Sequence, residues 1–344
     1  MKKRDVINLI KYHVENNDSA FREEAYDIVA DFNNNGDLEL GRYVLSLLSD
    51  KNTFIPQIMN NRSDFIKRVD VSNTHLFLPT VIMDDLKGII NAANLNAGVN
   101  KFLFQGFPGT GKTESAKQLA RILERELFIV DFDSLIDSKL GQTSRNIAAL
   151  FSEINDLPYP EKVIILFDEI DSLALDRIDS RDHREMGRAT SSVLKGFDSL
   201  NDSVIIIATT NLFDNFDSAL VRRFDKIINF NRYSKDDLMD VAEKIADFYL
   251  NKFSFAGRNM RLLKKIISLA SPIPYPGELA NLIKTAIVFS NSQNEYEYLI
   301  YILKQIKPEL VDKPKLLKDL GFTLREIEIL TNISKSTLSR EFSR

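Results

Sequence analysis

The spacing of apolar residues along the chain changes near residue 100. Before this point, apolar side chains recur every three or four positions, which is typical of amphipathic helices. Three such stripes predict a helical N-terminal domain over 1–50. Residues 51–75 are polar and have no period, which predicts a linker, and a further helix is expected from Pro79 to about residue 93.

Beyond residue 100, short apolar runs alternate with helical patterns. The runs are 102–104, 127–130, 163–167, 204–208 and 227–230, and the helical patterns are 112–125, 143–156 and 185–199. Apolar runs separated by helices are typical of a parallel sheet that is covered on both faces. The sequence therefore predicts an α/β core over 76–232, a helical region over 233–311 and an all-helical segment over 312–344.

A phosphate-binding pattern, G-x-x-x-x-G-K-[ST], lies between the first apolar run and the helical pattern after it. Glycines allow the backbone to fold around phosphate oxygens, and the helix that follows directs its positive end at them. The lysine can reach the β- and γ-phosphates, and the hydroxyl can hold Mg²⁺. A bare match can be a chance glycine-rich turn, but the strand before and the helix after favour a nucleotide site. The residues expected to bind the nucleotide are Gly106, Pro108, Gly109, Thr110, Gly111, Lys112, Thr113 and Glu114.

Two carboxylates, Asp168 and Glu169, stand where the third predicted strand ends. In open α/β sheets, ligands bind outside the carboxyl ends of the strands. Asp168 is expected to bind the Mg²⁺ shell, and Glu169 to orient and deprotonate the attacking water. The alternative is an Asp-Glu pair that begins a surface loop.

An asparagine and an arginine pair extend this set. Asn211 follows the fourth apolar run, where an amide can contact both the γ-phosphate and the attacking water; otherwise it is a turn residue. Arg222 and Arg223 precede the fifth run. They could be a solvated pair, or they could reach into a neighbouring subunit's site, where such a group raises the rate by about 10³–10⁵.

Four segments, GFPGTGKT, LFDEID, IATTN and DSALVRRFDK, occur in this order and resemble an AAA-type ATPase of the AAA+ superfamily. The resemblance covers roughly residues 76–290 and is closest in style to small single-ring members, which include protein remodellers. It implies a parallel sheet in the order 5-1-4-3-2, a helical lid, ATP and Mg²⁺ as cofactors, and a ring that is usually a hexamer.

The resemblance also implies roles for single residues. Residues 275–280 match the start of the lid helix, although a sensor-2 arginine is missing. Glu185 and Arg188 lie where some relatives place interface charges, and a solvated helix face is the alternative. The implied roles are Walker A for Lys112 and Thr113, Walker B for Asp168 and Glu169, sensor 1 for Asn211, and arginine fingers for Arg222 and Arg223.

One loop departs from the pattern of relatives that thread polypeptide. Their aromatic-hydrophobic-glycine loop corresponds here to Lys139, Leu140 and Gly141. A solvated lysine grips an extended chain poorly. The lysine could instead favour an acidic segment or a phosphate backbone, or the loop could contact nothing.

The C-terminal segment holds a second pattern. Thr323 and Glu326 form a capping box, a short turn follows, and Ser334 begins another helix. The pattern resembles the helix-turn-helix of resolvases and sigma-like regulators, and residues 313–344 carry an excess of three basic residues. A protein-docking module is the alternative. The residues expected to face DNA are Lys335, Ser336, Thr337, Ser339 and Arg340.

Composition limits the remaining function classes. The 344 residues include no cysteine and three histidines and carry a net charge of −4, so disulfides, thiolate sites and histidine metal clusters are not expected. There is no signal-peptide pattern and no apolar run near the ~20 residues of a membrane helix, which predicts a cytoplasmic protein without a membrane partner. The expected function is an ATP-hydrolysing ring that remodels or regulates a partner protein, bound through the N-terminal helices or the pore. The alternative is a DNA-associated ATPase anchored through residues 313–344.

Overall fold

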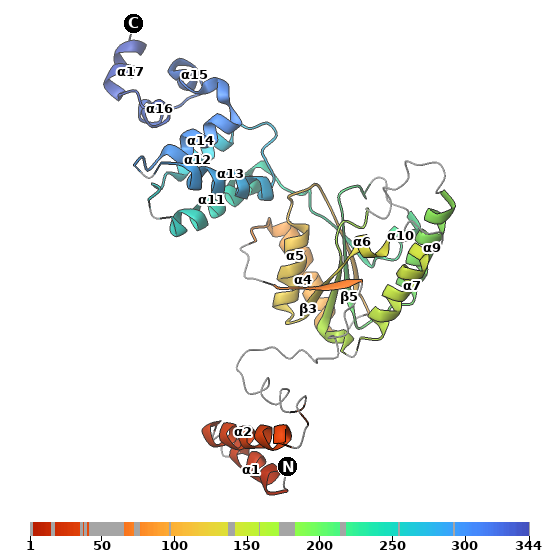
Figure 1. The fold of residues 1–344 in the computed structure, drawn as a ribbon. Coiled ribbons are helices and arrows are strands. Elements are labelled where there is room, and N and C mark those ends of the chain that lie inside the picture. The colour runs from red at the N-terminus through yellow and green to blue at the C-terminus, as the bar shows by residue number, and fades with distance from the viewer. Residues whose placement is uncertain are drawn as a thin grey trace. The chain divides into compact units, whose positions relative to one another are not determined.

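The structure is a computed structural model in which the chain divides into two compact units, Met1–Ser63 and Asp64–Arg344. Figure 1 shows the helices and strands of both units. The described residues are 3–14, 18–34, 37, 40, 65–71, 76–95, 98–136, 142–157, 159–171, 183–213, 218–253, 255–291 and 293–343.

Two of the three helices predicted for residues 1–50 lie in the described part of the first unit. Helices α1 (Lys3–Val14) and α2 (Asp18–Asn34) pack together, and Asn8 donates a 3.0 Å hydrogen bond to Glu24. The third predicted stripe falls on residues 40–48, of which only Leu40 is described. The apolar stripes of the first two helices therefore form a small helical pair.

The second unit is built on a six-stranded sheet with the order β1-β3-β4-β5-β2-β6. From β2 to β6 all strand pairs are parallel, and numbering these five strands along the chain gives 5-1-4-3-2 from β6 to β3. The predicted α/β fold and strand order are confirmed. The strands are β1 (Ile66–Val69), β2 (Lys101–Gln105), β3 (Glu126–Val130), β4 (Val163–Phe167), β5 (Ile205–Thr210) and β6 (Lys226–Asn229).

Strand β1 lies in the stretch 51–75 that was predicted to be a linker, so that prediction is wrong for Ile66–Val69. The strand pairs antiparallel with β3 at the edge of the sheet and buries Ile66. Its polar residues pair across the strands, Lys67 with Asp131 and Arg68 with Glu126 at 3.4 Å. Charged side chains are common on edge strands, and they hid the strand from a reading of apolar runs.

Helices cover both faces of the sheet, with α4 (Thr80–Leu95) and α5 (Lys112–Ile122) on one face and α7 (Gln142–Asn155) and α9 (His183–Asp198) on the other (Figure 1). On the second face the rings of Phe151, Phe167 and Phe197 lie 5.3–5.9 Å apart. Gly196 permits this packing, because a Cβ there would lie 2.1 Å from the Phe151 ring. The short elements between the larger ones are α6 (Phe132–Leu135), η2 (Pro160–Lys162) and α10 (Ser218–Val221).

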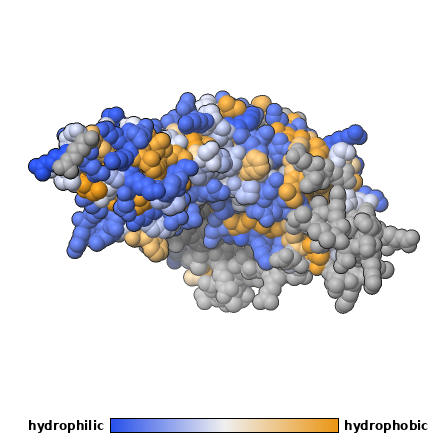
Figure 2. Space-filling view, turned by 90° about the horizontal axis from the view of Figure 1, so that it is seen from above, coloured by the Kyte–Doolittle hydropathy of each residue, from blue (hydrophilic) through white to orange (hydrophobic). Residues whose placement is uncertain are grey.

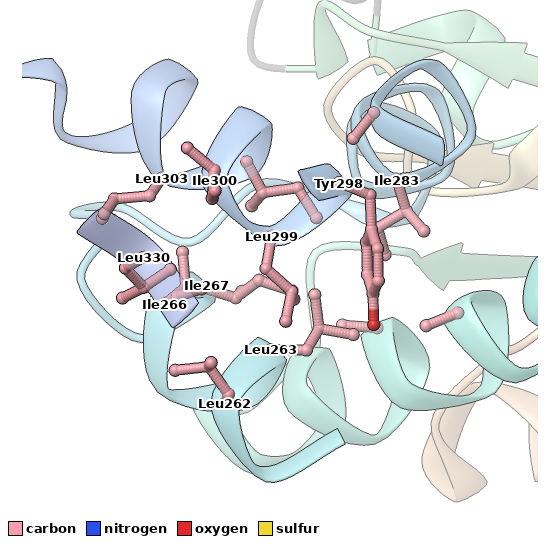
Figure 3. Packing of buried hydrophobic residues seen from close by; sticks show 14 of the residues in the cluster. Leu262, Leu263, Ile266, Ile267, Ile283, Tyr298, Leu299, Ile300, Leu303 and Leu330 are labelled. Carbon is pink, nitrogen blue, oxygen red and sulfur yellow. The ribbon is translucent and has the colours of Figure 1, made fainter. Parts of the chain in front are cut away.

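Seven helices and one short turn follow the sheet and share a single hydrophobic core. Figure 3 shows Leu330 beside Ile266 and Ile267, although these residues come from the C-terminal segment and from the preceding helical region. The predicted regions 233–311 and 312–344 are thus packed as one body. The elements are α11 (Lys235–Lys252), α12 (Met260–Ile267), α13 (Pro276–Phe289), α14 (Glu297–Ile306), η5 (Pro308–Leu310), α15 (Pro314–Asp319), α16 (Leu324–Thr331) and α17 (Lys335–Phe342).

A polar contact reinforces this joint core. The predicted capping box is present, with Thr323 and Glu326 bonded reciprocally at the start of α16. From α12, Lys265 donates to the Glu326 carboxylate at 2.9 Å and to the Gly321 carbonyl at 2.6 Å. The C-terminal helices are therefore fixed to the helices before them by both apolar packing and a partly buried ion pair.

The face drawn in Figure 2 is mainly hydrophilic over its described residues, with smaller hydrophobic patches. Within the described residues, no helix combines the length and the apolar character that crossing a bilayer requires.

Candidate active site

The phosphate-loop pattern forms a tight turn between β2 and α5. Gly109 and Gly111 have φ angles of 76° and 97°, which side-chain-bearing residues rarely adopt. The turn is fixed from within and from outside, because Thr110 Oγ1 donates to the Phe107 carbonyl at 2.8 Å and Phe107 N donates to Asn231 Oδ1 at 2.7 Å. Contacts within the chain thus fix the shape of the loop, with the first turn of α5 directed into it.

Lys112 lies almost completely inside the loop, with 7% of its surface exposed. Its ammonium donates to the carbonyls of Gly106 and Phe107 at 2.6 and 3.0 Å and to Asn211 Oδ1 at 2.7 Å. Burial lowers the pKa of Lys112, and the nearby carboxylates, Asp168 first among them, oppose this shift. The lysine therefore stands at the centre of the loop and already contacts the residue predicted as sensor 1.

Asp168 is held by two hydroxyl groups. Thr113 Oγ1 donates to its carboxylate oxygens at 2.9 and 3.2 Å, and Thr209 Oγ1 donates at 2.7 Å. Thr209 also accepts from the backbone N–H of Glu169 at 2.8 Å. The sequence predicted roles for Asp168 and Thr113 but not for Thr209, which lies one residue before the end of β5, next to β4, and orients both carboxylate residues.

Glu169 follows β4 with a φ angle of 54°, a left-handed conformation that is uncommon for glutamate. Its carboxylate is exposed and accepts from Asn211 Nδ2 at 3.3 Å. Asn211 thus bridges Lys112 and Glu169 through the two ends of its amide. A backbone outlier at this position is consistent with a functional constraint on the glutamate.

Asp171 is a second residue that the sequence reasoning did not select, although it ends the LFDEID segment. It is 5% exposed, and its Oδ1 has no hydrogen-bond partner among the described residues. Its other oxygen lies 3.5 Å from the Asn211 backbone N–H. Its charge also favours the protonated form of Lys112, so it contributes to the acidic side of the site.

These residues line a cavity with a volume of about 330 Å³, within the usual size range of ligand pockets. The helices after the sheet close one side of it. Gly277 N donates to the Gly109 carbonyl at 2.8 Å, and the Tyr233 hydroxyl donates to the Thr110 carbonyl at 2.8 Å. The lining residues are Leu76, Phe77, Pro108, Gly109, Gly111, Lys112, Thr113, Glu114, Asp168, Glu169, Thr209, Asn211, Ile245, Pro276, Gly277 and Ala280.

The donor set of this cavity fits a magnesium nucleotide. Mg²⁺ is usually bound by one or two protein oxygens together with phosphate oxygens, and Asp168 and Thr113 present adjacent oxygens of that kind. The glycine-rich turn and Lys112 supply the N–H and ammonium donors for phosphates. The pocket also has an apolar wall suited to a base, which includes Phe77 and Ile245.

The arginine pair does not join this cluster. Arg222 and Arg223 precede β6 at the end of the sheet opposite to the phosphate loop, because Asp225 N donates to the carbonyl of Lys101, the first residue of β2. Lys139, Leu140 and Gly141 lie outside the described residues, as do the side chains of Glu185 and Arg188. The structure therefore brings together all the predicted nucleotide residues except those expected to act between subunits.

Known proteins match the region that carries this site. Residues 102–232 match the family model described as "ATPase family associated with various cellular activities (AAA)". Residues 102–232 belong to the AAA family. The AAA domain thus extends from the first residues of β2 past the end of β6, and it holds every residue of the Walker motifs.

Individual relatives agree with this assignment. An uncharacterized AAA family ATPase of Sinorhizobium fredii, y4kL, is 41% identical over 133 residues, which are 39% of each chain. The peroxisomal ATPase PEX6 of Kluyveromyces lactis is 28% identical over 285 residues, 73% of this chain and 28% of PEX6. The chain therefore spans well under half the length of these relatives.

A solved structure shows the same fold. Trip13 of Escherichia coli MS115-1, known from a HORMA:CdnC:Trip13 complex, superposes with a TM-score of 0.55. The match covers 70% of this chain and 95% of that one at 16% identity. This similarity supports the AAA+ fold over both the AAA domain and the helices that follow it.

Proposed function

We propose that this protein hydrolyses ATP with Mg²⁺ in a ring, and that turnover changes the conformation of a bound partner protein. One observation carries the proposal: Lys112, Asp168 and Glu169 meet Asn211 at one cavity against the helices after the sheet. The helices after the sheet, α11 to α17, form the lid. The membership of residues 102–232 in the AAA family supports the same reaction.

Each side chain of the site has a separate role in ATP binding or hydrolysis. Lys112 and the loop N–H groups bind the phosphates, and Thr113 and Asp168 hold Mg²⁺, which would neutralise phosphate charge. Glu169 accepts the proton of the attacking water, since its carboxylate is exposed to the cavity and its backbone is fixed by Thr209. Asn211 orients that water and the terminal phosphate.

The lid is the element that would transmit the reaction. It contacts the phosphate loop through Gly277 of α13, so a change of charge at the loop acts on the lid directly. Tyr233, just before α11, also donates to the loop. Closure of one packed body against another is a common way to turn ligand chemistry into movement. A hexameric ring, with the partner bound through α1 and α2 or through the pore, is the assembly we propose.

The test uses a Glu169→Gln variant of the full chain. It should bind ATP like the wild type but lose turnover, because the amide cannot accept the proton. Partners captured with this variant in ATP are then identified as protein or nucleic acid. A Glu309→Gln variant, which changes an exposed glutamate of η5, is the matched control and should hydrolyse ATP normally. Brisk hydrolysis by Glu169→Gln would refute the assignment of the base.

DNA association through the C-terminal segment is the second candidate function. Helix α17 is capped by Ser334 and exposes the residues that a recognition helix would use. One contact argues against DNA binding. Glu328 accepts a 2.9 Å hydrogen bond from the Lys335 backbone N–H, which places a carboxylate at the start of α17. The exposed residues of α17 are Lys335, Ser336, Thr337, Ser339, Arg340 and Glu341, of which the first five are those expected to face DNA.

Point variants test DNA binding better than a deletion. Removing residues 313–344 would uncover the lid core, since Leu317, Leu330 and Leu338 are buried in it. The double variant Lys335→Ala/Arg340→Ala leaves that core intact. Salt-dependent retention on DNA that this variant loses would support the second candidate. No binding of the wild type at low salt would exclude it.

A further inference from the structure

Arg222 and Arg223 are adjacent in the sequence and match one motif, but their side chains have different surroundings in the structure. They stand between α10 and β6, and β6 runs parallel to β2 with Gln105 opposite Asn229. The phosphate loop follows Gln105, so the arginines lie one strand length away, about 13 Å for four residues. Neither can serve the nucleotide of its own subunit without rearrangement of the sheet edge.

Arg223 is bound within its own subunit. Its Nε and Nη2 donate to the two oxygens of Asp198 at 3.1 Å each, and its Nη1 donates to the Ala219 carbonyl at 2.7 Å. Bidentate arginine–carboxylate pairs fix geometry as well as charge. This pair ties the end of α10 to the end of α9.

A second contact fixes the same segment. Phe224 is buried, and its ring meets that of Phe197 edge-on at 5.3 Å. The residues that contact Arg223 and Phe224 in this way, Asp198 and Phe197, are consecutive in α9. The contacts of Arg223 and Phe224, the next two residues along the chain, therefore fix the backbone at Arg222.

Arg222 has the opposite character. Its side chain is exposed, and its guanidinium has no hydrogen bond or ion pair with any residue that the structure describes. Its backbone N–H donates to the Ser218 carbonyl at 3.3 Å, so only the side chain is free to move. An arginine on a fixed backbone with a free guanidinium is suited to a charge that another molecule presents.

We propose that Arg222 alone is the catalytic arginine that completes a neighbouring subunit's site, while Arg223 and Asp198 form a positioning pair that holds Arg222 in place. This inference rests on the proposed function, since an arginine that acts in trans needs a second subunit. It assigns Asp198 a role that no motif indicates, and it separates two residues that share one motif.

The first test compares kcat for ATP hydrolysis at saturating MgATP in full-length variants. Arg222→Ala should lower kcat by about 10³ without a change of melting temperature. Arg223→Ala and Asp198→Ala should lower kcat equally, by about tenfold to 10²-fold, since each misplaces Arg222. Arg222→Ala/Arg223→Ala should match Arg222→Ala, because Arg223 acts only through Arg222. Arg261→Ala, at a highly exposed arginine of α12, is the control and should keep the wild-type kcat.

Two results of this comparison would overturn the proposal. A wild-type kcat for Arg222→Ala would remove that residue from catalysis. An inactive Arg223→Ala beside a fully active Asp198→Ala would make Arg223 the group that contacts the nucleotide. A double variant much slower than Arg222→Ala would likewise show that Arg223 contributes independently.

The second test separates the inference from the proposed function. Arg222→Ala subunits mixed with Lys112→Ala subunits should recover activity above either alone, and absence of recovery overturns the action in trans. Wild-type activity that is proportional to protein concentration, from a particle of monomer mass, overturns the shared interface of the proposed function itself. A wild type that assembles and turns over ATP while Arg222→Ala does the same overturns only the arginine assignment.

Discussion

The backbone N–H of Gly277 donates a 2.8 Å hydrogen bond to the carbonyl of Gly109, and this contact joins the start of α13 to the centre of the phosphate loop. The approach is close because Gly277 has no side chain: a Cβ on Gly277 would lie 2.9 Å from the Gly109 Cα. The lid thus rests on the loop backbone itself. A change in loop conformation on phosphate binding has a direct route to α13 and, through the shared core, to α17.

Replacement of Gly277 by alanine should separate the lid from the loop. Overpacking of this kind costs about 1–3 kcal/mol, so we expect ATP affinity to fall by about 5- to 150-fold. Equilibrium titration with a fluorescent ATP analogue measures the effect. Gly88→Ala is the control, because a Cβ at this exposed position of α4 meets nothing within 4 Å. An unchanged ATP affinity in Gly277→Ala would show that the contact is not retained in the nucleotide complex.

Thr209→Val should impair hydrolysis although its side chain need not touch nucleotide. The hydroxyl holds both Asp168 and the Glu169 backbone, and loss of such a supporting contact typically costs 10–100-fold in activity or metal affinity. Measurement of kcat against Mg²⁺ concentration should show a lower kcat and a higher Mg²⁺ requirement. Thr209→Ser keeps the hydroxyl and should restore most of the activity.

The adjacent Thr210→Val is the matched control for this experiment. Thr210 is equally buried, but its hydroxyl accepts from the Leu212 N–H and makes no hydrogen bond to either carboxylate within the described part of the chain. It should keep a kcat near that of the wild type. Equal losses in both valine variants would indicate general damage to β5 rather than loss of carboxylate orientation.

The sequence predicted those parts of the fold that have a strong local signal. Gly106–Thr113 and the Asp168-Glu169 pair could be recognised because the phosphate chemistry requires fixed residue types at fixed spacing. The sheet order came from the resemblance to AAA-type ATPases, since apolar runs alone do not say which strands are neighbours. Strand β1 was missed because an edge strand with one deeply buried residue leaves almost no apolar pattern.

Other features could not be predicted from the sequence because they depend on contacts between segments that are distant along the chain. Thr209 becomes a carboxylate partner only where β5 lies beside β4. Arg223 differs from Arg222 only because Asp198 ends α9 at the right place. Likewise, residues 312–344 read as a separate helical module, whereas Leu330 and Leu338 complete the core that α12 and α14 begin.

The hydrophobic core shared by α11 to α17 leads to a prediction about stability. Leu330→Ala should destabilise the lid by about 2–5 kcal/mol, because it removes a fully packed side chain from a closed cluster. Urea unfolding followed by circular dichroism measures this. Leu316→Ala, at a residue of α15 that is 43% exposed, should cost much less. Equal and small costs for both variants would mean that α16 does not share the lid core in solution.

The ion pair between Lys265 and Glu326 makes the stability of the contact between α12 and α16 depend on pH. Burial alone would raise the pKa of Glu326, but hydrogen bonds from Thr323 and Lys265 outweigh burial and hold the pKa below its usual value. A carboxyl group with a lowered pKa in the folded state stabilises the fold at pH values above its unfolded pKa, about 4.3, and this stabilisation is lost as pH falls through the lower folded pKa. Glu326→Gln should therefore cost about 1 kcal/mol at neutral pH, because glutamine keeps the capping box but loses the charge that strengthens the contact with Lys265, and progressively less below about pH 4. Glu309→Gln should leave the free energy of unfolding nearly unchanged at neutral pH. A difference between wild type and Glu326→Gln that stays constant from pH 7 to pH 3 would contradict a role for the charged carboxylate in fixing α16 to α12.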